Sequence, residues 1–581
     1  KDNKKKGEKI DEAILGNNLN NAGASNCWNL DGSHTKSGKP LLSNDPHLSN
    51  GHPNIFFIVK LYLPDMVISG ATMVGTPVFI TGSNSFISWG LTTENSDNTD
   101  FCEEIIQGDY YIKDNKNYPL TKVKEIINIK NSEAFVFEVK YTENGPIFGK
   151  KIPASFSLFN EEFENTFPLS ARIGFMRHEY TSFDFYMRLN LARSPNDFIP
   201  YKNDYILANY NVHWASKDGQ IGYLTIGIIN LKKYQNRFCH GFSSQDVIIN
   251  EIPPEEMLHL TSPKKGYIIS ANNKPVSNNY LYKIIGNHNN ARAYRIHELL
   301  EGYFKNDTKI SVNESIIIMK DVKNPNAAYI LPKILEIVRR NMEAKELREN
   351  KNYQYLRKWN FEYDKESREA TLYSLLERNL CLQLLTKKMS IEKAKPLLNF
   401  FPYYNFIYGM IDKIYKGEKI ALKECTVYNR KDDCEKYIVN VFKHLNEYTK
   451  GFRESSGLMK KWGTVNYNYF PNTAFDDIPI LNKIFSRKKY VSGCRDTIKI
   501  SRSTGNSKMG EFVGSQSPRI QFVCDMIEPE EPYIMLAGGN NGSPIQMYYN
   551  NLMDKFEGKV LIKFKNIDFN DEKNEKRIIT I

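Results

Sequence analysis

Long apolar runs are missing from this chain of 581 residues. A membrane-spanning helix needs ~18 to 20 consecutive apolar residues, and because no stretch approaches that length, we expect no membrane span. The first 20 residues also lack the apolar middle of a signal peptide. The chain begins with Lys1 and not with methionine, so we expect a fragment from which a targeting signal or an upstream segment has been left out. The compartment stays open, with the secretory pathway or another extracytoplasmic compartment as candidates.

Zinc-binding patterns are also missing. The eight cysteines form no CxxC pair and no Cys/His cluster at zinc spacing, which argues against a zinc finger. Cys425 and Cys434 are close enough in sequence to form a disulfide. An even number of cysteines in a long chain does not, however, reveal the redox compartment.

No single basic patch accounts for the net charge of +11. The lysines are spread along the chain and alternate with Glu and Asp, so we expect no nucleic-acid partner. The longest basic run, KDNKKKGEK at the start, is small, polar and charged, which is typical of a solvated linker.

The chain is rich in material for a folded core, with 41% hydrophobic and 13% aromatic residues. Strand-like runs extend from Ser25 to about residue 145, and Asp218-Gly219 predicts a tight hairpin with two positive-φ positions within residues 211–227. Apolar residues recur at helical spacing from about 290 to 450, and strand-like runs then return. We therefore predict an α+β fold, divided into a linker (1–24), a first core part (25–290), a mostly helical insertion (291–455) and a second core part (456–581).

Ser25 stands in GASNCWNLDGSH, directly after two small residues. A lone serine after Gly-Ala is most often a turn residue. Its surroundings make it a candidate for chemistry, because His47 follows 22 residues later in SNDPHL. Asp97 and Asp100 lie further on, in SDNTDF.

Several motifs, in their order and spacing, resemble the catalytic chain of the penicillin acylase family, which includes the cephalosporin and acyl-homoserine-lactone acylases. The motifs are SNCW, SGKPLLSNDPHL, SGATMVGTP, TGSNSFISWGLTT, SDNTDF, YTENGPI, WASKDGQIGY, ISANNKP, NARAYRI, LRKWNFEYDKESREATLYSLL and AGGNNGSP. They cover nearly all of residues 23–555. The resemblance implies an N-terminal-nucleophile (Ntn) hydrolase, with a four-layer αββα sandwich and a large helical insertion.

For Ser25, the resemblance implies a precursor that cuts its own Ala24–Ser25 bond. The Ser25 hydroxyl would then be the nucleophile and its free α-amine the base, since such an amine has a pKa near ~8. Attack on an amide carbonyl would form an acyl-enzyme that water hydrolyses. Residues 1–24 would be the spacer after an upstream alpha chain of the same precursor, which is the expected protein partner. Ala24 stands where relatives usually have glycine, a mild departure that allows slower cleavage.

The resemblance assigns further residues to the site. His47 would hydrogen-bond the amine or the hydroxyl of Ser25 and fix its direction. The backbone N–H of Thr93 and the side chain of Asn272 would donate to the oxyanion of the tetrahedral intermediate. Asn273 is the alternative to Asn272, and Arg292 would support the site.

A calcium site is implied by Asp97 and Asp100, with the Thr99 carbonyl between them, since these are hard oxygen ligands. Its role would be structural. No cofactor is expected for catalysis.

The acyl pocket is expected to be apolar and concave. Its candidate residues are mostly aliphatic: Leu48, Ile80, Thr81 and Leu91. On strands, such residues are equally well explained as core. The expected substrate is a small N-acyl amide with an apolar acyl group.

Two alternatives stay open. Relatives carry a His-Tyr pair and an acidic residue where this chain has QMYYNN (residues 546–551), and an arginine where Gln521 stands. With Ala24 and the basic inserts, these departures also fit a non-catalytic, unprocessed relative that serves as a binding or scaffold protein. A conventional Ser-His-Asp hydrolase is the other alternative, but the chain has no GxSxG motif. Asp496 is a further candidate for orienting the histidine.

Overall fold

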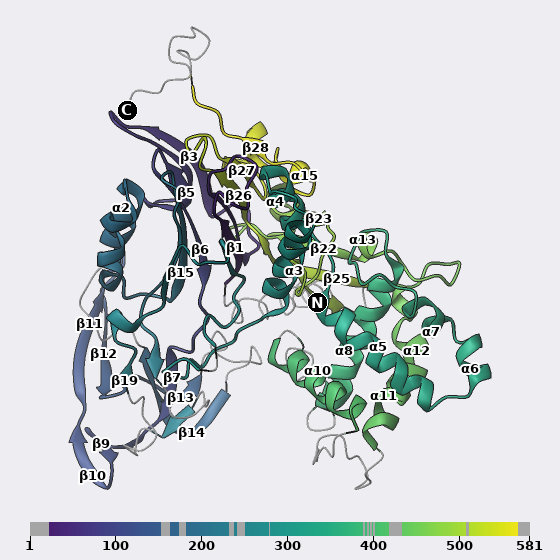
Figure 1. Ribbon diagram of the computed structural model, residues 1–581. Helices are drawn as coiled ribbons and strands as arrows, with labels where there is room; N and C mark the ends of the chain where they lie inside the picture. The colour runs from purple at the N-terminus through teal and green to yellow at the C-terminus, as the bar shows by residue number, and fades with distance from the viewer. Residues whose placement is uncertain are drawn as a thin grey trace.

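The computed structural model describes residues 23–152, 163–173, 182–231, 238–240, 250–277, 279–386, 390–391, 394, 398, 401–417, 433–506 and 510–567. Residues 1–22 of the predicted linker and Cys425 lie outside this part. Two facing β-sheets form the centre of the molecule, and a helical lobe stands at one side (Figure 1). Within the described part, no helix is both long and apolar enough to cross a membrane.

The first central sheet has ten strands in the order β23–β22–β25–β2–β26–β27–β28, with β1 paired to β2, β21 to β1 and β24 to β25. These strands are β1 (Ala24–Leu30), β2 (Leu41–Ser49), β21 (Tyr267–Ser270), β22 (Asn466–Phe470), β23 (Arg487–Tyr490), β24 (Arg502–Asn506), β25 (Glu511–Pro518), β26 (Ile520–Asp525), β27 (Tyr533–Leu536) and β28 (Ile562–Lys563). The second sheet has seven strands in the order β20–β16–β15–β6–β5–β4–β3. They are β3 (Phe56–Tyr62), β4 (Val67–Met73), β5 (Phe79–Asn84), β6 (Ile87–Thr93), β15 (Tyr210–Ser216), β16 (Ile221–Ile226) and β20 (His259–Thr261).

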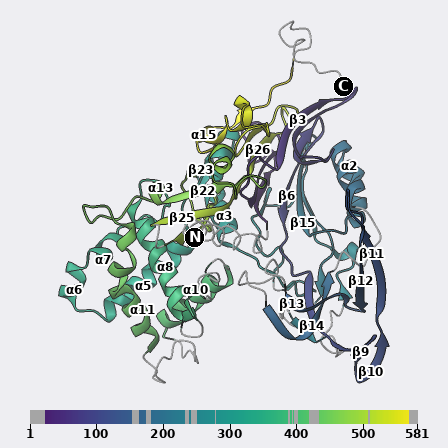
Figure 2. The ribbon, with the colours of Figure 1, turned by 180° about the vertical axis from the view of Figure 1, so that it is seen from behind.

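Helices cover the outer faces of both sheets (Figures 1 and 2). Helices α3 (Ala291–Lys305) and α4 (Val312–Met319) pack on the first sheet, and α2 (Phe183–Leu191) packs on the second. The resulting α–β–β–α order confirms the predicted four-layer α+β fold.

Strand β1 shows how the sequence builds two of these layers. Successive side chains of a strand point to opposite faces of the sheet. Cys27 therefore packs between the two sheets with Leu42 and Phe522, whereas Trp28 packs on the helix side with Ile296 of α3. Both faces of β1 are buried, and this central position fixes the direction of every side chain near Ser25.

The predicted hairpin at residues 211–227 is confirmed as β15–β16, but its loop differs from the expectation. Ser216 N–H donates to the Gln220 carbonyl at 2.9 Å, so the loop has three residues instead of two. In such a loop only the last position takes a left-handed conformation. Accordingly Gly219 has φ +110°, and Asp218 has no positive φ.

Smaller sheets extend beyond the second central sheet. A six-stranded sheet contains β11 (Thr121–Ile127), β12 (Phe135–Thr142), β13 (Gly145–Ile152), β14 (Phe163–Ile173), β7 (Thr99–Glu103) and β18 (Phe238–His240). The others join β8 (Ile105–Gln107), β9 (Tyr110–Lys113) and β10 (Lys116–Pro119), and β17 (Asn230–Leu231) with β19 (Asn250–Glu251). Cys102 in β7 takes part in a disulfide, and so does Cys434. In the β18–β7 ladder, Cys239 lies opposite Cys102.

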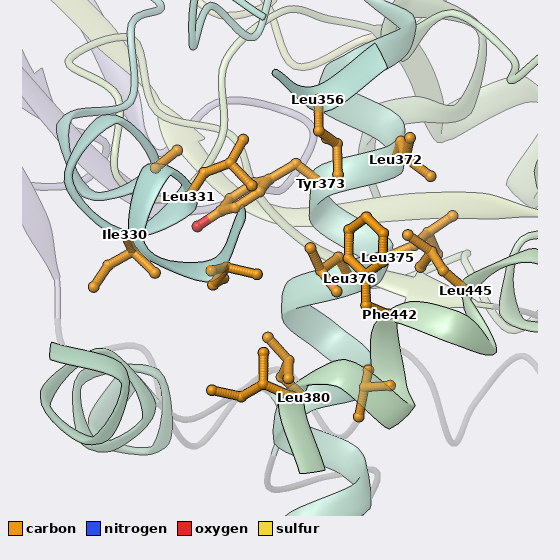
Figure 3. Close-up of a cluster of buried hydrophobic side chains, with 14 of the residues drawn as sticks. Ile330, Leu331, Leu356, Leu372, Tyr373, Leu375, Leu376, Leu380, Phe442 and Leu445 are labelled. Atoms are coloured by element: carbon orange, nitrogen blue, oxygen red, sulfur yellow. The ribbon is translucent and has the colours of Figure 1, made fainter. Parts of the chain in front are cut away.

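The helical lobe has its own apolar core. Its helices are α5 (Pro325–Arg340), α6 (Ala344–Glu349), α7 (Lys351–Leu356), α8 (Arg368–Thr386), α10 (Phe401–Tyr415), α11 (Asp433–Lys443), α12 (Leu445–Tyr448) and α13 (Trp462–Val465), while α14 (Leu481–Phe485) and α15 (Met553–Phe556) follow. Helix α5 begins where Asn324 caps the Ala327 N–H at 2.9 Å. Leu331, Leu376 and Phe442 meet in the core shown in Figure 3. The domain boundaries 291 and 455 stay a prediction.

Candidate active site

Ser25 is the second residue of β1, and its side chain faces the second sheet, on the same side as Cys27. It is 4% exposed. Its Oγ donates a hydrogen bond to the carbonyl oxygen of Ala24 at 2.5 Å. The hydroxyl therefore lies directly beside the peptide bond that precedes it.

Asn272 and Arg292 converge on the backbone of Ser25. The Ser25 N–H donates to Asn272 Oδ1 at 2.7 Å. Arg292 Nη1 donates to the Ser25 carbonyl at 2.9 Å, and Arg292 Nη2 donates to Asn272 Oδ1 at 2.8 Å. Asn272 has φ +61°, a left-handed conformation that asparagine tolerates better than most residues. Asn273 instead bonds the nearby Ala271 and Lys274 backbone, so Asn272 is the asparagine that faces Ser25.

Thr93, at the end of β6, lies beside Asn272 in the same site. Asn272 Nδ2 donates to the Thr93 carbonyl at 2.7 Å and to Thr93 Oγ1 at 2.8 Å. Hydrogen-bonded and non-hydrogen-bonded pairs alternate along an antiparallel ladder. Glu94 N–H donates to the Asn209 carbonyl, so the next pair, Thr93 with Tyr210, is non-hydrogen-bonded. Consequently the Thr93 N–H points away from β15, to the side on which its carbonyl meets Asn272.

His47 does not form the expected hydrogen bond to Ser25 in this structure. In the β1–β2 ladder, His47 lies opposite Ala24, and Ser25 lies opposite Pro46. Directly paired side chains share a face of the sheet, and neighbours along a strand do not. The imidazole therefore lies on the helix side, where its Nε2 is 2.9 Å from Asp45 Oδ2 and 3.4 Å from Asn26 Nδ2. The expected contact with Ser25 is absent in this uncut chain, and both the contact in the cut chain and a catalytic role for His47 stay predictions.

Burial shifts the pKa values of the ionisable side chains on the helix side of β1. It raises the pKa of the Asp45 carboxyl well above its ordinary value, against the opposing effect of Arg292. It lowers the pKa of His47 well below the usual range, and Arg292 lowers it further. Burial lowers the pKa of Arg292 to about 10, which leaves the guanidinium charged at neutral pH. Both members of the Asp45–His47 pair are thus driven toward their neutral forms beside a permanent cation.

A cavity of about 1320 Å³ opens in front of Ser25. Leu48, Ile80 and Leu91 line it, as the sequence predicts for an acyl pocket. Thr81 does not line it: neighbours on a strand point to opposite faces, and the buried Thr81 hydroxyl donates to the Trp89 carbonyl at 3.1 Å. The volume exceeds the roughly 300–1,000 Å³ of common ligand pockets.

The calcium prediction falls largely outside the described residues. Thr99 and Asp100 begin β7, but their side chains are not among those described. The backbone N–H of Asp97 donates to the Ile285 carbonyl at 2.8 Å. Among the side chains that the structure describes, no three His, Cys, Asp or Glu residues gather as a metal site. The calcium site therefore stays a prediction.

Asn26 and Asp45 are members of this centre that the sequence reasoning did not assign. Arg292 Nη1 donates to Asn26 Oδ1 at 2.5 Å, and Asn26 Nδ2 donates to Asp45 Oδ2 at 3.2 Å. Asp45 and His47 are two apart on a strand, a spacing that could have placed them on one face. Asp496, the candidate for orienting His47, instead accepts from Asn289 and forms an ion pair with Arg495.

A family model described as penicillin amidase matches residues 3–569. Because the match covers nearly the whole chain, the chain belongs to the penicillin amidase family. This confirms the resemblance found in the motifs.

Two relatives and one solved structure show how similar this chain is to known proteins. The chain is 30% identical over 133 residues to the acyl-homoserine lactone acylase QuiP of Pseudomonas aeruginosa, covering 22% of this chain and 16% of that protein. It is 23% identical over 381 residues to the penicillin acylase 2 proenzyme of Pseudomonas sp. strain SE83, covering 64% and 46%. The matched stretches therefore span less than half of these relatives. Thermostable penicillin G acylase from Alcaligenes faecalis shares the fold, with a TM-score of 0.71, 14% identity, and coverage of 96% of this chain and 98% of that chain.

Proposed function

We propose that this protein is an N-terminal serine amidohydrolase that cleaves N-acyl amides through a Ser25 acyl-enzyme. The observation that carries the proposal is the convergence of Asn272 and Arg292 on the Ser25 backbone, at the wall of a large cavity. Membership of the penicillin amidase family supports an acylase activity. The two relatives compared above are named as acylases, which points in the same direction.

Cleavage of the Ala24–Ser25 bond is the first step of this proposal. The Ser25 Oγ, which lies against the Ala24 carbonyl, attacks its carbon. The C–N bond breaks as the C–O bond forms, and the Oγ proton passes to the departing nitrogen. Water then hydrolyses the ester, leaving Ser25 with a free hydroxyl and a free amine.

The new amine has an acceptor and a cation beside it. Asn272 Oδ1, which accepts from the Ser25 nitrogen in the intact chain, orients the amine after the cut. A neighbouring positive charge disfavours protonation, so the Arg292 guanidinium lowers the pKa of the amine from its ordinary value near ~8. A neutral amine can then take the Oγ proton during attack on the substrate.

The oxyanion of the substrate intermediate is stabilised by the Thr93 N–H and by Asn272 Nδ2. Both donors lie in the same part of the site. The Thr93 N–H points away from Tyr210, its partner in the β6–β15 ladder. Asn272 Nδ2 donates to Thr93 in the intact chain, so it exchanges one of these bonds for the oxyanion. Such donors act strongly because they are preorganised in a buried site.

The substrate in this proposal carries an apolar acyl group. Leu48, Ile80 and Leu91 border the cavity near Ser25 and offer it an aliphatic surface. The upstream alpha chain of the same precursor remains the proposed protein partner.

Processing and turnover test the proposal together. We expect the intact mass and the N-terminal sequence of the mature protein to show a chain that begins at Ser25. Ser25→Ala should abolish both the cut and the hydrolysis of a panel of acyl amides, and Ser25→Cys is the conservative comparison. A folded native protein that stays uncut would instead favour a non-catalytic binding or scaffold protein. An uncut chain that hydrolyses amides would favour a conventional serine hydrolase.

A further inference from the structure

Glu94 is a buried glutamate that directly follows Thr93 in the chain and has no part in the proposed reaction. The residue is 0% exposed. Its backbone N–H donates to the Asn209 carbonyl at 3.0 Å, so its backbone is fixed at the end of the β6–β15 ladder. A buried carboxyl destabilises a fold unless hydrogen bonds satisfy it. The hydrogen-bond partners of this carboxyl therefore show which parts of the chain it connects.

Both oxygens of the Glu94 carboxyl contact residues outside β6. Oε2 accepts from the Ser96 N–H at 2.7 Å, and Oε1 lies 3.2 Å from His288 Nε2. The His288 side chain is only 9% exposed, so solvent has little access to this contact. Within the part of the chain that the structure describes, His288 is the one basic side chain within ion-pair distance of Glu94. The carboxyl therefore connects the end of β6 to the chain segment that precedes α3.

The chain segment 285–290 also pairs through its backbone with the residues that follow β6. The Asn287 N–H donates to the Asn95 carbonyl at 3.0 Å, and Gly286 forms an antiparallel bridge with Ser96. A Cβ atom at position 286 would collide with the Asn95 carbonyl oxygen, so this close approach of the two backbones requires glycine. These backbone pairs fix the position from which the segment contacts the buried carboxyl.

The residue after His288 bonds the second proposed oxyanion donor, Asn272. The Asn289 N–H donates to the Asn272 carbonyl at 2.9 Å. Asn272 has φ +61°, a backbone conformation that costs free energy and persists only where the surroundings fix it. One series of contacts therefore runs from Thr93 through Glu94, His288 and Asn289 to Asn272. It supplements the direct bonds between Asn272 Nδ2 and Thr93.

We propose that Glu94 is a positioning residue that acts through His288 to keep Asn272 at the distance from Thr93 that an oxyanion needs. Asn272 Nδ2 gives up one of its bonds to Thr93 when it donates to the oxyanion, so the second connection maintains the spacing of the two donors at that step. Such donors act strongly because their positions are fixed before the charge develops. The effect on catalysis rests on the proposed function. The contact between Glu94 and His288 does not, because its effect on Asn272 can be measured without turnover.

Hydrogen–deuterium exchange in the full-length, uncut Ser25→Ala protein tests the contact. The reporters are the amides of Asn287 and Asn289, since both donate to backbone carbonyls beside the contact. In this background we expect Glu94→Ala to speed their exchange about tenfold or more through local opening. Glu94→Gln should speed it less, because glutamine keeps an acceptor oxygen. A peptide from α8 is the internal reference, and unchanged reporters in Glu94→Ala would overturn the inference.

Glu104→Ala is the matched control for this experiment. Glu104 is also 0% exposed, and its carboxyl accepts from Thr142 in β12 and Ser170 in β14. The variant removes the same buried group from another sheet and should leave the reporters unchanged; an acceleration equal to that of Glu94→Ala would overturn the inference. If Glu94→Ala fails to fold, His288→Ala decides, because it removes the other partner of the contact, and unchanged reporters there would also overturn the inference.

Turnover of the processed protein then tests the positioning role. We expect Glu94→Ala to lower kcat about 10- to 100-fold, an effect typical of a slightly misplaced catalytic group. KM should stay within about twofold, because neither Glu94 nor His288 lines the cavity. Glu94→Gln should recover most of kcat, and Glu104→Ala should keep both constants. An unchanged kcat in processed Glu94→Ala, or a loss confined to KM, would refute the positioning role. Absence of hydrolysis in the wild type would bear on the proposed function alone, and hydrogen exchange would still decide the contact.

Discussion

The core of the helical lobe and the centre around Ser25 are both buried, but they are built from opposite kinds of side chain. The lobe core consists of apolar residues such as Leu331, Leu376 and Phe442 (Figure 3). The centre around Ser25 consists of polar and charged side chains, each at most 4% exposed: Ser25, Asn26, Asp45, His47, Asn272 and Arg292. Apolar burial stabilises the fold without needing partners, whereas buried polar groups must find them.

This difference separates stability from chemistry within one chain. Each polar side chain of the centre makes at least one hydrogen bond, and Asn272 bonds Ser25, Thr93 and Arg292. In the lobe core, the titratable members are tyrosines and cysteines such as Tyr373 and Cys381, and burial raises the pKa of each well above its ordinary value, which favours the neutral form. We therefore expect changes in the centre to affect activity first and changes in the lobe core to affect folding first. Three predictions test this division and a fourth tests a buried histidine of the second sheet, and they run from the largest effect to the smallest.

Asn272→Ala should reduce self-cleavage and kcat by about 10³-fold, or ~4 kcal/mol. It removes one oxyanion donor, which alone is worth ~2.7–4 kcal/mol, and also the acceptor of the Ser25 nitrogen. The measurements are the rate of appearance of the chain that begins at Ser25 and the steady-state rate on an acyl amide. Asn273→Ala is the matched control, because Asn273 bonds only the local backbone. Equal losses in both variants would contradict the assignment.

Leu376→Ala should destabilise the lobe by about 3 kcal/mol and leave kcat of the folded protein unchanged. Leu376 is fully buried in α8, and truncation of a buried leucine costs ~2–5 kcal/mol through lost burial and a residual cavity. Urea unfolding measures the loss. Phe406→Ala, at a side chain that is 44% exposed on α10, is the control and should cost under ~1 kcal/mol. A large drop in kcat for Leu376→Ala would show that the two regions are coupled.

His213→Asn should make the sandwich more resistant to acid by about 2 kcal/mol at pH 5. Burial lowers the pKa of His213 to about 3. Because the unfolded histidine titrates near ~6.5, the unfolded chain binds a proton that the folded chain excludes as the pH falls below that value. The penalty at pH 5 is (6.5 − 5) × ~1.36 kcal/mol. Asparagine keeps a donor for Asn29 Oδ1, which lies 3.4 Å from His213 Nδ1. Urea midpoints from pH 7 to pH 5 give the slope, and equal slopes for both proteins would refute the prediction.

The elements of both regions could be predicted because their signals are local. The helical period from about 290 to 450 and the strand runs around Ser25 depend on neighbouring residues alone. The assembly of the centre could not be predicted in that way, since Asn272 and Arg292 lie 247 and 267 residues from Ser25. The resemblance supplied those residues.

Details that depend on pairing register were missed. The loop length at Gly219 follows from the Ser216–Gln220 pair. The direction of Thr81 follows from the alternation within β5, which the sequence does carry, so Ile80 and Thr81 could not both have lined the pocket. A single sequence carries the alternation within a strand but not the partner opposite each residue.

The last prediction has the smallest expected effect and concerns His47, whose side-chain direction follows from the pairing of β1 with β2. Because the pleat directs its ring to Asp45 and away from Ser25, we expect His47→Gln to lower kcat only about tenfold, or ~1.4 kcal/mol. The loss would act through Asn26, which lies between His47 and Arg292. Burial and Arg292 lower the pKa of His47 well below its usual range, which favours the neutral ring. The pH profile of kcat should therefore keep its shape in the variant. A loss of about 100-fold or more with a displaced profile would show instead that the imidazole reaches Ser25 once the Ala24–Ser25 bond is cut.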